Sequence, residues 1–473
     1  MSISAAFNSA LSGLTANSRL TEVISGNLAN ALTPGHAPRT LELEARGTGG
    51  GVAVTGVTRH VDPVVLADRR LADSALADAQ TRAGFAASLE RALGLPGDGG
   101  GLADRLAAFE AAVATASSRP EDDARLNAVL REATTFATAL NDAAEQIETL
   151  RSRADTDIAG AVERLNTSLA QVAEINTRIV SARAAGHETA ALEDRRQQAI
   201  DGIAELVPVR QLERGRGAVA LVSTGGALLL DGRPAQIGFE ATPLVAANMT
   251  VENGLVSGLE IGGRPAPTGA GGPLAGGRLG ALFDNRDGIG PEAQRGLDAL
   301  ARDLAERVES LTPPPSPGLF TDAGARFAPA DETGLAGRLA VNPAVDPAQG
   351  GTLFRLRTGP DAAAPGPPAV APYLAAIGNA LAARQAPEPG APQGNLSDHV
   401  AQISSRIAQE RLAAERAVSF ASGQAGELRE LELRGGVDSD AELQRLLVVE
   451  QAFSANARMI RTLDEMMQTL LRI

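Results

Sequence analysis

Apolar residues near the start of the chain recur at alternating steps of four and three positions. The series comprises Ile3, Phe7, Ala10, Leu14, Ile24 and Leu28, with the polar residues Asn17 and Thr21 in the two remaining places. Heptad spacing of this kind is typical of a helix that packs in a coiled coil, not of a strand. The helix is expected to end at Pro34 and Gly35, because proline lacks an N–H donor and glycine tolerates a left-handed turn.

A second helix with the same spacing is predicted near the end of the sequence, after Gly435-Gly436. Ser439 and Glu442 have the spacing of a capping box at its start. The acids Asp438 and Asp440 fit helix capping better than a calcium loop, which needs a glycine and a distal glutamate that this segment lacks. Its apolar face comprises Leu446, Val449, Phe453, Ala457, Ile460, Leu463, Met467 and Leu470.

These two amphipathic helices can bury their stripes in two ways. One is an ordinary helix pair within a single chain, and the other adds packing against copies in neighbouring subunits. Residues 1–33 contain only two charged side chains, Arg19 and Glu22, so several faces of the first helix require partners, which favours assembly. The predicted assembly residues are Ile3, Phe7, Leu14, Ile24, Leu28, Leu446, Val449, Phe453, Ile460, Leu463, Met467 and Leu470.

Long helical patterns between the ends predict a rod-shaped trunk. Helix resumes near Asp62, and a long helix is expected after SSRPEDDARL, where Ser118 and Glu121 form another candidate capping box. Heptad spacing persists over residues 158–179. A continuous helix over residues 119–184 would be on the order of 95 Å long.

A return helix is predicted to follow the turn at Gly186 and to stop at Pro208. Further helix is expected over residues 277–310. The chain is expected to be helical again from Leu396, with one break at Gly435-Gly436.

The middle of the chain has a different pattern. Short β-rich runs in residues 208–274 predict strands joined by turns at Gly225-Gly226 and Asp231-Gly232. Residues 351–357, GTLFRLR, predict another strand. Two proline-rich stretches, residues 359–372 and 386–394, are expected to be stiff connectors outside any core.

The patterns together predict a mainly α fold with a β-containing insertion: paired terminal coiled-coil helices, a long-helix trunk and a smaller β-rich outer module. The terminal helical domain is predicted to comprise residues 1–35 and 438–473. The trunk is predicted to comprise residues 36–207, 275–311 and 395–437, and the outer region residues 208–274 and 312–394.

Composition narrows the possible partners. The chain has 473 residues, a net charge of −14 and 3 % aromatic residues, which disfavours nucleic acid and anionic membranes. All 43 basic residues are arginine, and their scatter over positions that look exposed suggests a nucleotide bias. No cysteine occurs, no apolar run is long enough for a membrane span, and no secretory signal is visible, so a cytosolic location is favoured before any motif is considered.

Residues that could support catalysis or bind a metal or cofactor form no pattern. His36, His60, His187 and His399 are widely separated, lack metal-ligand spacing and are each expected in a loop or in solvent. GLPGDGGG lacks the Gly-Lys-Ser/Thr ending of a phosphate loop, and no Gly-x-Ser-x-Gly elbow occurs. We therefore expect no catalytic, cofactor or metal site.

The two ends resemble the bacterial flagellar axial proteins. Residues 4–35 have the arrangement of that family's N-terminal signature, with Ser-Gly-Leu at 12–14, Asn-x-x-Asn at 27–30 and Thr-Pro-Gly at 33–35. The last residues are similar to the matching C-terminal helix. The segment from Gly276 to Val308, with LFT and LAVNPAV further on, resembles a hook-associated branch of the family. One departure is His36, where the family usually has an aromatic residue.

The resemblance implies a structural, non-enzymatic subunit that assembles as a ring joining the hook to the filament, with the terminal helices forming an inner tube. It implies as partners other copies, hook protein, a second hook-filament junction protein and a flagellar export chaperone. It also implies an extracellular location, reached through the flagellar export apparatus without a cleaved signal peptide. The alternatives are another axial subunit such as hook-associated protein 3 or flagellin, a soluble coiled-coil scaffold, or an enzyme with an active site in the β region.

Overall fold

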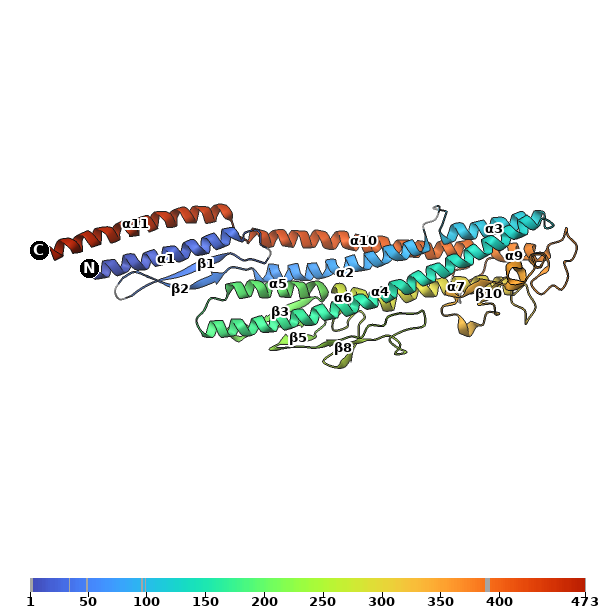
Figure 1. Ribbon diagram of the computed structural model, residues 1–473, viewed down its shortest axis with the longest axis horizontal. Coiled ribbons are helices and arrows are strands. Elements are labelled where there is room, and N and C mark those ends of the chain that lie inside the picture. Colours follow the sequence, from blue (N-terminus) through green and yellow to red (C-terminus); the bar gives the residue numbers. More distant parts are fainter. Residues whose placement is uncertain are drawn as a thin grey trace.

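A computed structural model describes residues 3–33, 35–47, 50–94, 97, 99–387 and 392–472. The molecule is a long rod with both termini at one end (Figure 1). The helices are α1 (Ile3–Ala29), α2 (Pro63–Leu93), α3 (Leu102–Ser118), α4 (Asp123–Ala184), α5 (Ala190–Leu206), α6 (Gly277–Asp284), α7 (Gly290–Glu309), α8 (Arg355–Thr358), α9 (Pro372–Ala382), α10 (Leu396–Arg434) and α11 (Ser439–Leu471). The predicted fold class, mainly α with a β-containing insertion, is confirmed.

The strands form four small antiparallel sheets. A hairpin of β1 and β2 lies beside α1, and the larger insertion after α5 holds the sheets β3-β4-β5-β6 and β7-β8-β9. The turns predicted at Gly225-Gly226 and Asp231-Gly232 do connect strands. The strands are β1 (Arg39–Ala45), β2 (Val52–Arg59), β3 (Val209–Glu213), β4 (Val219–Ser223), β5 (Leu228–Asp231), β6 (Arg233–Pro234), β7 (Ile237–Gly238), β8 (Leu259–Ile261), β9 (Arg264–Ala266), β10 (Phe320–Asp322) and β11 (Leu339–Val341).

Helix α4, with 62 residues and a length of about 93 Å, is the spine of the trunk. Its first half packs with α3, α7, α9 and the segment after α7 in one hydrophobic core. Its second half packs with α5, α6 and the sheets of the insertion in another. A helix of this length needs two cores because each neighbouring element covers only part of its apolar stripe.

Several helix boundaries differ from those predicted. Ser118 is the last residue of α3, and Asp122 caps α4 by accepting a hydrogen bond from Ala124 N at 2.9 Å, so the capping box of Ser118 and Glu121 is wrong. The capping box at the start of α11 is also wrong, because Asp438 is the N-cap and Ser439 the first helical residue. Aspartate and serine are about equally good N-caps, so spacing alone does not decide which of two nearby candidates caps the helix.

The strand predicted over residues 351–357 is wrong. Helix α8 occupies its end, with Leu356 buried in the core. Arg357 donates hydrogen bonds to the carbonyls of Pro365 and Pro368, at 3.2 and 2.8 Å, which keeps the proline-rich stretch against the trunk. Periodicity alone cannot separate a short buried helix from a short strand.

Residues 312–394, which the sequence suggests as part of an outer region, contribute to the same core as α3 and α4. The side chains that do so include Leu319, Phe320, Phe327, Leu335, Leu356, Tyr373, Leu374 and Ile377. The hairpin of β1 and β2 was not predicted. The predicted end of α1 at Pro34 lies outside the described residues, and the helix itself ends at Ala29.

A buried polar cluster lies between the two cores. Arg286, in the π-helical turn Asn285–Ile289, forms an ion pair with Asp155 of α4 at 2.5 Å, and both side chains are fully buried. Its guanidinium also lies over the rings of Phe239 and Phe283. The Asp155 carboxylate accepts a further hydrogen bond from Thr242 N at 2.6 Å, which fastens the insertion to the spine.

Arg151 completes this cluster. It donates hydrogen bonds to the carbonyls of Arg286, Ala246 and Met249 at 2.7 to 3.0 Å. Gly290 makes room for it, because a Cβ there would lie 2.7 Å from Arg151 Cγ. Arginine at these positions is structural, so the expectation that arginines lie at ordinary exposed positions is wrong for Arg151 and Arg286.

We predict that Arg286→Met destabilises the trunk by about 3–5 kcal/mol, because it leaves the Asp155 carboxylate buried without its partner. Urea unfolding followed by circular dichroism measures this. Arg214→Met is the matched control, since Arg214 pairs with Asp231 at an exposed site, and its unfolding midpoint should stay near that of the wild type. Equal midpoints for Arg286→Met and the wild type would contradict the structural role of the cluster.

Candidate functional site: the paired terminal helices

Helices α1 and α11 lie side by side in opposite directions at one end of the rod (Figure 1). Ile24 of α1 and Val449 and Leu463 of α11 are buried. Of the other predicted assembly residues, Ile3, Phe7, Leu14, Leu28, Leu446 and Ile460 are half-buried, and Phe453, Met467 and Leu470 remain exposed. The pair therefore covers only part of each apolar stripe within one chain, and a role for these residues in assembly stays a prediction.

Gly13, in the Ser-Gly-Leu motif, sets how closely the two helices approach. A Cβ at this position would lie 2.7 Å from Asn456 Nδ2 of α11. A side chain at position 13 would therefore have to displace the Asn456 amide from its place against α1. Gly26, on the same helix, has nothing within 4 Å of such a Cβ, so the two glycines of α1 differ in this respect.

Asn27, near the C-terminal end of α1, forms hydrogen bonds with both β1 and α11. Its Nδ2 donates to Arg39 O at 2.8 Å and to Glu442 Oε1 of α11 at 3.3 Å, while its Oδ1 accepts from Arg39 N at 3.0 Å. Glu442, which sequence spacing assigned to a capping box, instead reaches Asn27 and pairs with Arg445 at 2.9 Å. The Asn-x-x-Asn motif marks Asn27 in the sequence, but its partners could not be read from spacing.

A joint connects the β1-β2 hairpin to the trunk through Asp194 of α5. Arg39 of β1 and Arg59 of β2 both donate to its carboxylate, at 2.5 and 2.6 Å. The His36 Nδ1 lies 3.5 Å from the same carboxylate, and its side chain is only 6 % exposed. One carboxylate thus holds the two strands that follow α1.

Burial, reinforced by the charge of Arg39, lowers the pKa of His36 below its usual value despite the nearby Asp194 carboxylate. The imidazole in the joint is therefore neutral near pH 7. His36 lies in the loop between α1 and β1, in line with the expectation of a loop or solvent position, although its side chain is buried there. That expectation is wrong for His399, which lies in α10 with its side chain buried and Nδ1 2.9 Å from Asp303 Oδ2.

A second ionic cluster joins α2, α5 and α10 next to this joint. Arg69 contacts Asp73, Asp201 and Glu432, at 2.6 to 2.7 Å. Burial alone would lower the pKa of Arg69, but the Asp201, Glu432 and Asp73 carboxylates raise it above its ordinary value. The cluster fixes the end of α10 just before the chain turns into α11.

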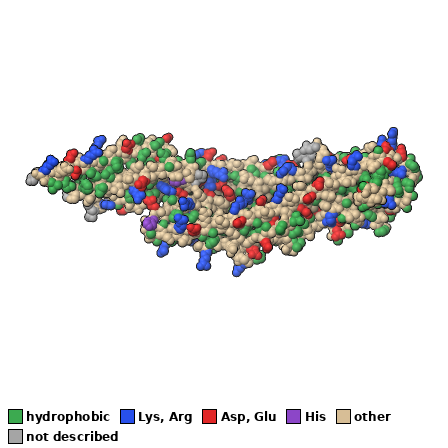
Figure 2. Space-filling view, in the orientation of Figure 1, with side chains coloured by type: hydrophobic (Ala, Val, Ile, Leu, Met, Phe, Trp, Pro, Cys, Tyr) green, Lys and Arg blue, Asp and Glu red, His purple; other side chains and the backbone are tan. Residues whose placement is uncertain are grey.

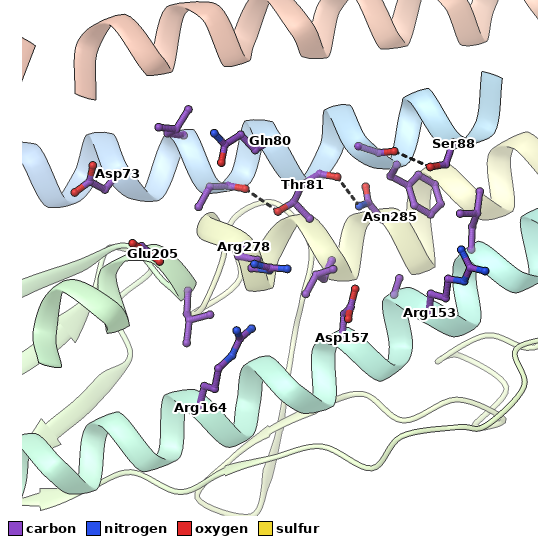
Figure 3. Close-up of a pocket in the computed structure, with 18 of the residues that line it drawn as sticks. Asp73, Gln80, Thr81, Ser88, Arg153, Asp157, Arg164, Glu205, Arg278 and Asn285 are labelled. Atoms are coloured by element: carbon purple, nitrogen blue, oxygen red, sulfur yellow. Dashed lines mark hydrogen bonds between the residues drawn. The ribbon is translucent and has the colours of Figure 1, made fainter. Parts of the chain in front are cut away.

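A groove of about 540 Å³ opens between α2, α4 and α6 (Figure 3). Arg153, Asp157 and Arg164 line it from α4, and these charges are spread along the helix instead of converging on one point. Thr81 and Ser88 of α2 donate to carbonyls of their own helix at 2.7 and 2.9 Å, so neither hydroxyl is activated by a neighbouring base. The geometry does not resemble an active site.

Within the described ranges, no group of three or more His, Asp or Glu side chains could hold a metal ion. Among the described residues, no helix is both long enough and apolar enough to cross a membrane. The most distinctive surface of the molecule is therefore the partly covered helix pair, where hydrophobic side chains are visible over the terminal helices in Figure 2.

The sequence of this chain is similar to those of known flagellar proteins. Residues 86–312 match the family described as flagellar hook-associated protein FlgK helical domain. Residues 435–473 match the family described as flagellar basal body rod FlgEFG protein C-terminal. The chain is 23 % identical to flagellar hook-associated protein 1 of Bacillus subtilis (strain 168), over 97 % of this chain and 96 % of that protein.

A solved structure of the flagellar hook junction protein FlgK from Burkholderia pseudomallei is also similar. The match has a TM-score of 0.46 and 21 % identity, and it covers 55 % of this chain and 47 % of that one. This chain thus matches about half the length of that structure.

We predict that Gly13→Leu forces α1 away from α11 and weakens the terminal pair by about 1–3 kcal/mol, as overpacking does elsewhere. Limited proteolysis should then cut the terminal helices faster than in the wild type. Gly26→Leu is the matched control and should not speed cleavage, because its Cβ points into open space and leucine favours helix. Equal cleavage rates for the two variants would contradict the close-approach role of Gly13.

We predict that His36 makes stability fall at acidic pH. Because its folded pKa lies below the unfolded value of about 6.5, the unfolded chain takes up a proton that the folded chain resists as the pH drops below about 6.5. The loss of stability levels off once the pH falls below the pKa of His36 in the folded chain. His36→Gln should therefore lose less free energy of unfolding than the wild type between about pH 7.5 and 5 in urea titrations.

His187→Gln is the control for this measurement, because that side chain is exposed at the turn after α4. It should retain the wild-type difference between the two pH values. An identical pH dependence in His36→Gln and the wild type would show that the joint is insensitive to this imidazole.

Proposed function

The chain belongs to the family of flagellar hook-associated protein 1, and on that premise we propose that it is a structural subunit assembling as a ring between hook and filament. The observation that carries the proposal is the apolar surface left open on α11. Its exposed apolar side chains are Leu443, Leu447, Val448, Phe453, Met459, Met466, Met467, Leu470 and Leu471.

Helical geometry places three of these side chains together on one part of the α11 surface. Val449, at the contact with α1, and Val448 differ by one residue and therefore by about 100° around the helix axis. Met459 follows Val448 by eleven residues and Met466 follows Met459 by seven, so these three lie on one face. This open stripe of Val448, Met459 and Met466 lies to one side of the face that contacts α1, about 100° around the helix axis, so a second helix can pack there without displacing α1.

Other copies of this chain and hook protein are the partners that this surface supports. A flexible, methionine-containing stripe adapts to more than one partner, as a junction requires. We include a second hook-filament junction protein among the partners. We also propose that a flagellar export chaperone covers α11 before assembly, because an exposed apolar stripe would otherwise promote aggregation.

The proposed location is extracellular, in the flagellum, reached through the flagellar export apparatus without a cleaved signal peptide. The proposed role is purely structural. In the groove between α2, α4 and α6 the hydroxyls of Thr81 and Ser88 donate to carbonyls of their own helix and not to an oriented base, which is compatible with a structural role.

We predict that replacing Val448, Met459 and Met466 together with glutamine abolishes incorporation while leaving the monomer helical. These side chains lie outside the contact with α1, so the intramolecular pair should persist. Electron microscopy of cells in which the variant replaces the wild-type chain should show hooks without filaments. Circular dichroism of the purified variant should match the wild type.

The matched control replaces Glu450, Arg461 and Asp464 with glutamine, at exposed polar positions on the same helix. It should support normal filaments. Normal filaments in the open-stripe variant, or in a chain lacking residues 440–473, would refute a role for α11 in joining subunits.

A further inference from the structure

A long groove runs along one side of the spine helix α4. The hollow of about 540 Å³ between α2, α4 and α6 shares Arg164 and Glu205 with a second hollow of about 390 Å³ (Figure 3). That hollow shares Ser168 with a third one of about 560 Å³, between α4 and α5. From Leu150 to Gln171 the groove follows α4 for about 32 Å, which is room for about six turns of another helix.

Charged side chains of α4 lie in this groove without partners. Arg153, Asp157 and Arg164 line it, and none of them makes an ion pair within the described ranges. With Gly160 they follow one another at steps of four, three and four residues, so the four lie on one side of the helix and are named the α4 stripe. Elsewhere on the trunk opposite charges pair, as around Arg69. The α4 stripe therefore offers charges of both signs to a partner.

A buried polar atom in the same groove also lacks a partner. Asn285, in the π-helical turn, is only 2 % exposed, and its Oδ1 accepts no hydrogen bond from the described residues. Its Nδ2 donates a single long hydrogen bond, of 3.4 Å, to Thr81 O. An unpaired buried acceptor is unfavourable, and π-helical turns occur frequently at functional sites. The groove thus lacks a donor that a bound partner can supply.

Glycines inside three helices have no explanation within one chain. Gly84 of α2 and Gly202 of α5 line the groove, and Gly160 belongs to the α4 stripe. A Cβ at any of these positions would meet nothing within 4 Å, and alanine would favour the helix more strongly. Close approach by the backbone of another helix is a physical reason for glycine at such positions.

The outer face of α10 has matching features. Arg416, Phe420, Gly423 and Glu427 follow one another at the same steps of four, three and four residues, and all four are exposed, Phe420 by 75 %. Arg416 and Glu427 make no ion pair within the described part of the chain. A Cβ at Gly423 would meet nothing within 4 Å. These four residues are named the α10 stripe.

The two stripes are placed as a ring requires. Helices α4 and α10 run in the same direction along the rod, so the α10 of one copy is parallel to the α4 of a neighbour that points the same way (Figure 1). Arg429 of α10 lines the groove, so both stripes lie at a similar level along the rod. Phe420 precedes Arg429 by nine residues, about 180° around the helix axis, so the α10 stripe points away from the side on which Arg429 reaches the groove. Each copy in a ring meets its two neighbours with roughly opposite sides, related by rotation about the ring axis.

We propose that in the ring the α10 stripe of one copy packs into the α4 groove of the adjacent copy. The contact joins two different surfaces of the chain, so it can repeat from copy to copy until the ring closes. It lies on the trunk, separate from the terminal helices. This inference rests on the proposed function, because it presumes that copies assemble side by side.

Close approach of two glycines sets the register of this contact. With Gly423 against Gly160, Glu427 and Arg164 are level, because each lies four residues further along its helix, and they pair. The arginine of the α10 stripe then lies within one turn of the aspartate of the α4 stripe, a distance that its side chain can span. Its guanidinium has five donors, enough to serve the aspartate and to offer a hydrogen bond to Asn285.

Cysteine cross-linking tests the register, because the natural chain contains no cysteine. Gln171→Cys and Arg434→Cys are combined in one chain, since both positions are exposed and each lies eleven residues beyond its glycine. After assembly on isolated hooks, a short thiol–thiol cross-linker should give covalent dimers and higher multimers. Gln171→Cys with Leu433→Cys is the matched control, because Leu433 is exposed but lies about 100° away around α10, and it should give none.

A charge swap tests the ion pair. Glu427→Arg and Arg164→Glu should each reduce incorporation into the ring at least about tenfold, because like charges then face each other in the contact. The double variant should restore incorporation, since opposite charges again meet. Glu240→Arg is the control for the change in net charge, because Glu240 is exposed in the insertion, and it should incorporate normally.

Filling the groove separates assembly from folding. Gly160→Leu should leave the isolated chain at least as stable as the wild type in urea, because its Cβ points into open space and leucine favours helix. The same variant should incorporate about tenfold less, because the added side chain keeps the neighbouring helix away. A loss of stability without a loss of incorporation would contradict the proposed role of Gly160.

The possible failures are distinguishable. Wild-type chain that does not assemble on hooks would remove the proposed function itself. Normal assembly without cross-links in the Gln171/Arg434 variant, or a charge swap that fails to restore incorporation, would overturn only the contact between stripe and groove. Circular dichroism of each variant checks folding, which should be unchanged because the substituted side chains are exposed.

Discussion

Burial of apolar helix stripes is the constraint on which the rest of this structure depends. The chain contains few aromatic residues, so its cores are built from long seams of Ala, Leu, Ile and Val between helices. Helix α4 satisfies this constraint completely, because partners cover its stripe along its whole length. Helix α11 does not, because α1 covers only one of its apolar faces. The same physical rule thus gives a stable trunk and an end that needs further partners.

Arginine side chains connect the helices, the insertion and the β1-β2 hairpin at places that the apolar cores do not reach. Between the two cores, Arg286 and Arg151 connect the spine to the insertion, and at the joint Arg39 and Arg59 share the carboxylate of Asp194. A planar guanidinium with five donors can bind several acceptors at once, which a lysine ammonium does less well. The arginines of this chain are therefore part of its architecture, whatever the origin of the missing lysine.

Much of the fold could be predicted from periodicity, because long heptad patterns have few alternative structures. The positions of α4, α5, α10 and α11 follow directly from the spacing of apolar residues and from Gly186, Pro208 and Gly435-Gly436. Caps were less predictable, since several acids compete within a few residues, as at Asp122 and Asp438. The contacts of Asn27, Asp194 and His399 could not be predicted at all, because their partners lie far away in sequence.

Hydrogen exchange along α11, compared between the isolated chain and the chain assembled between hook and filament, tests the central claim most directly. The account predicts weak protection of α11 amides in the isolated chain, strong protection of α4 in the same sample, and a large gain in α11 protection on assembly. Strong protection of α11 in the isolated chain that does not change on assembly would contradict the account, because the helix would then already have all the partners it needs.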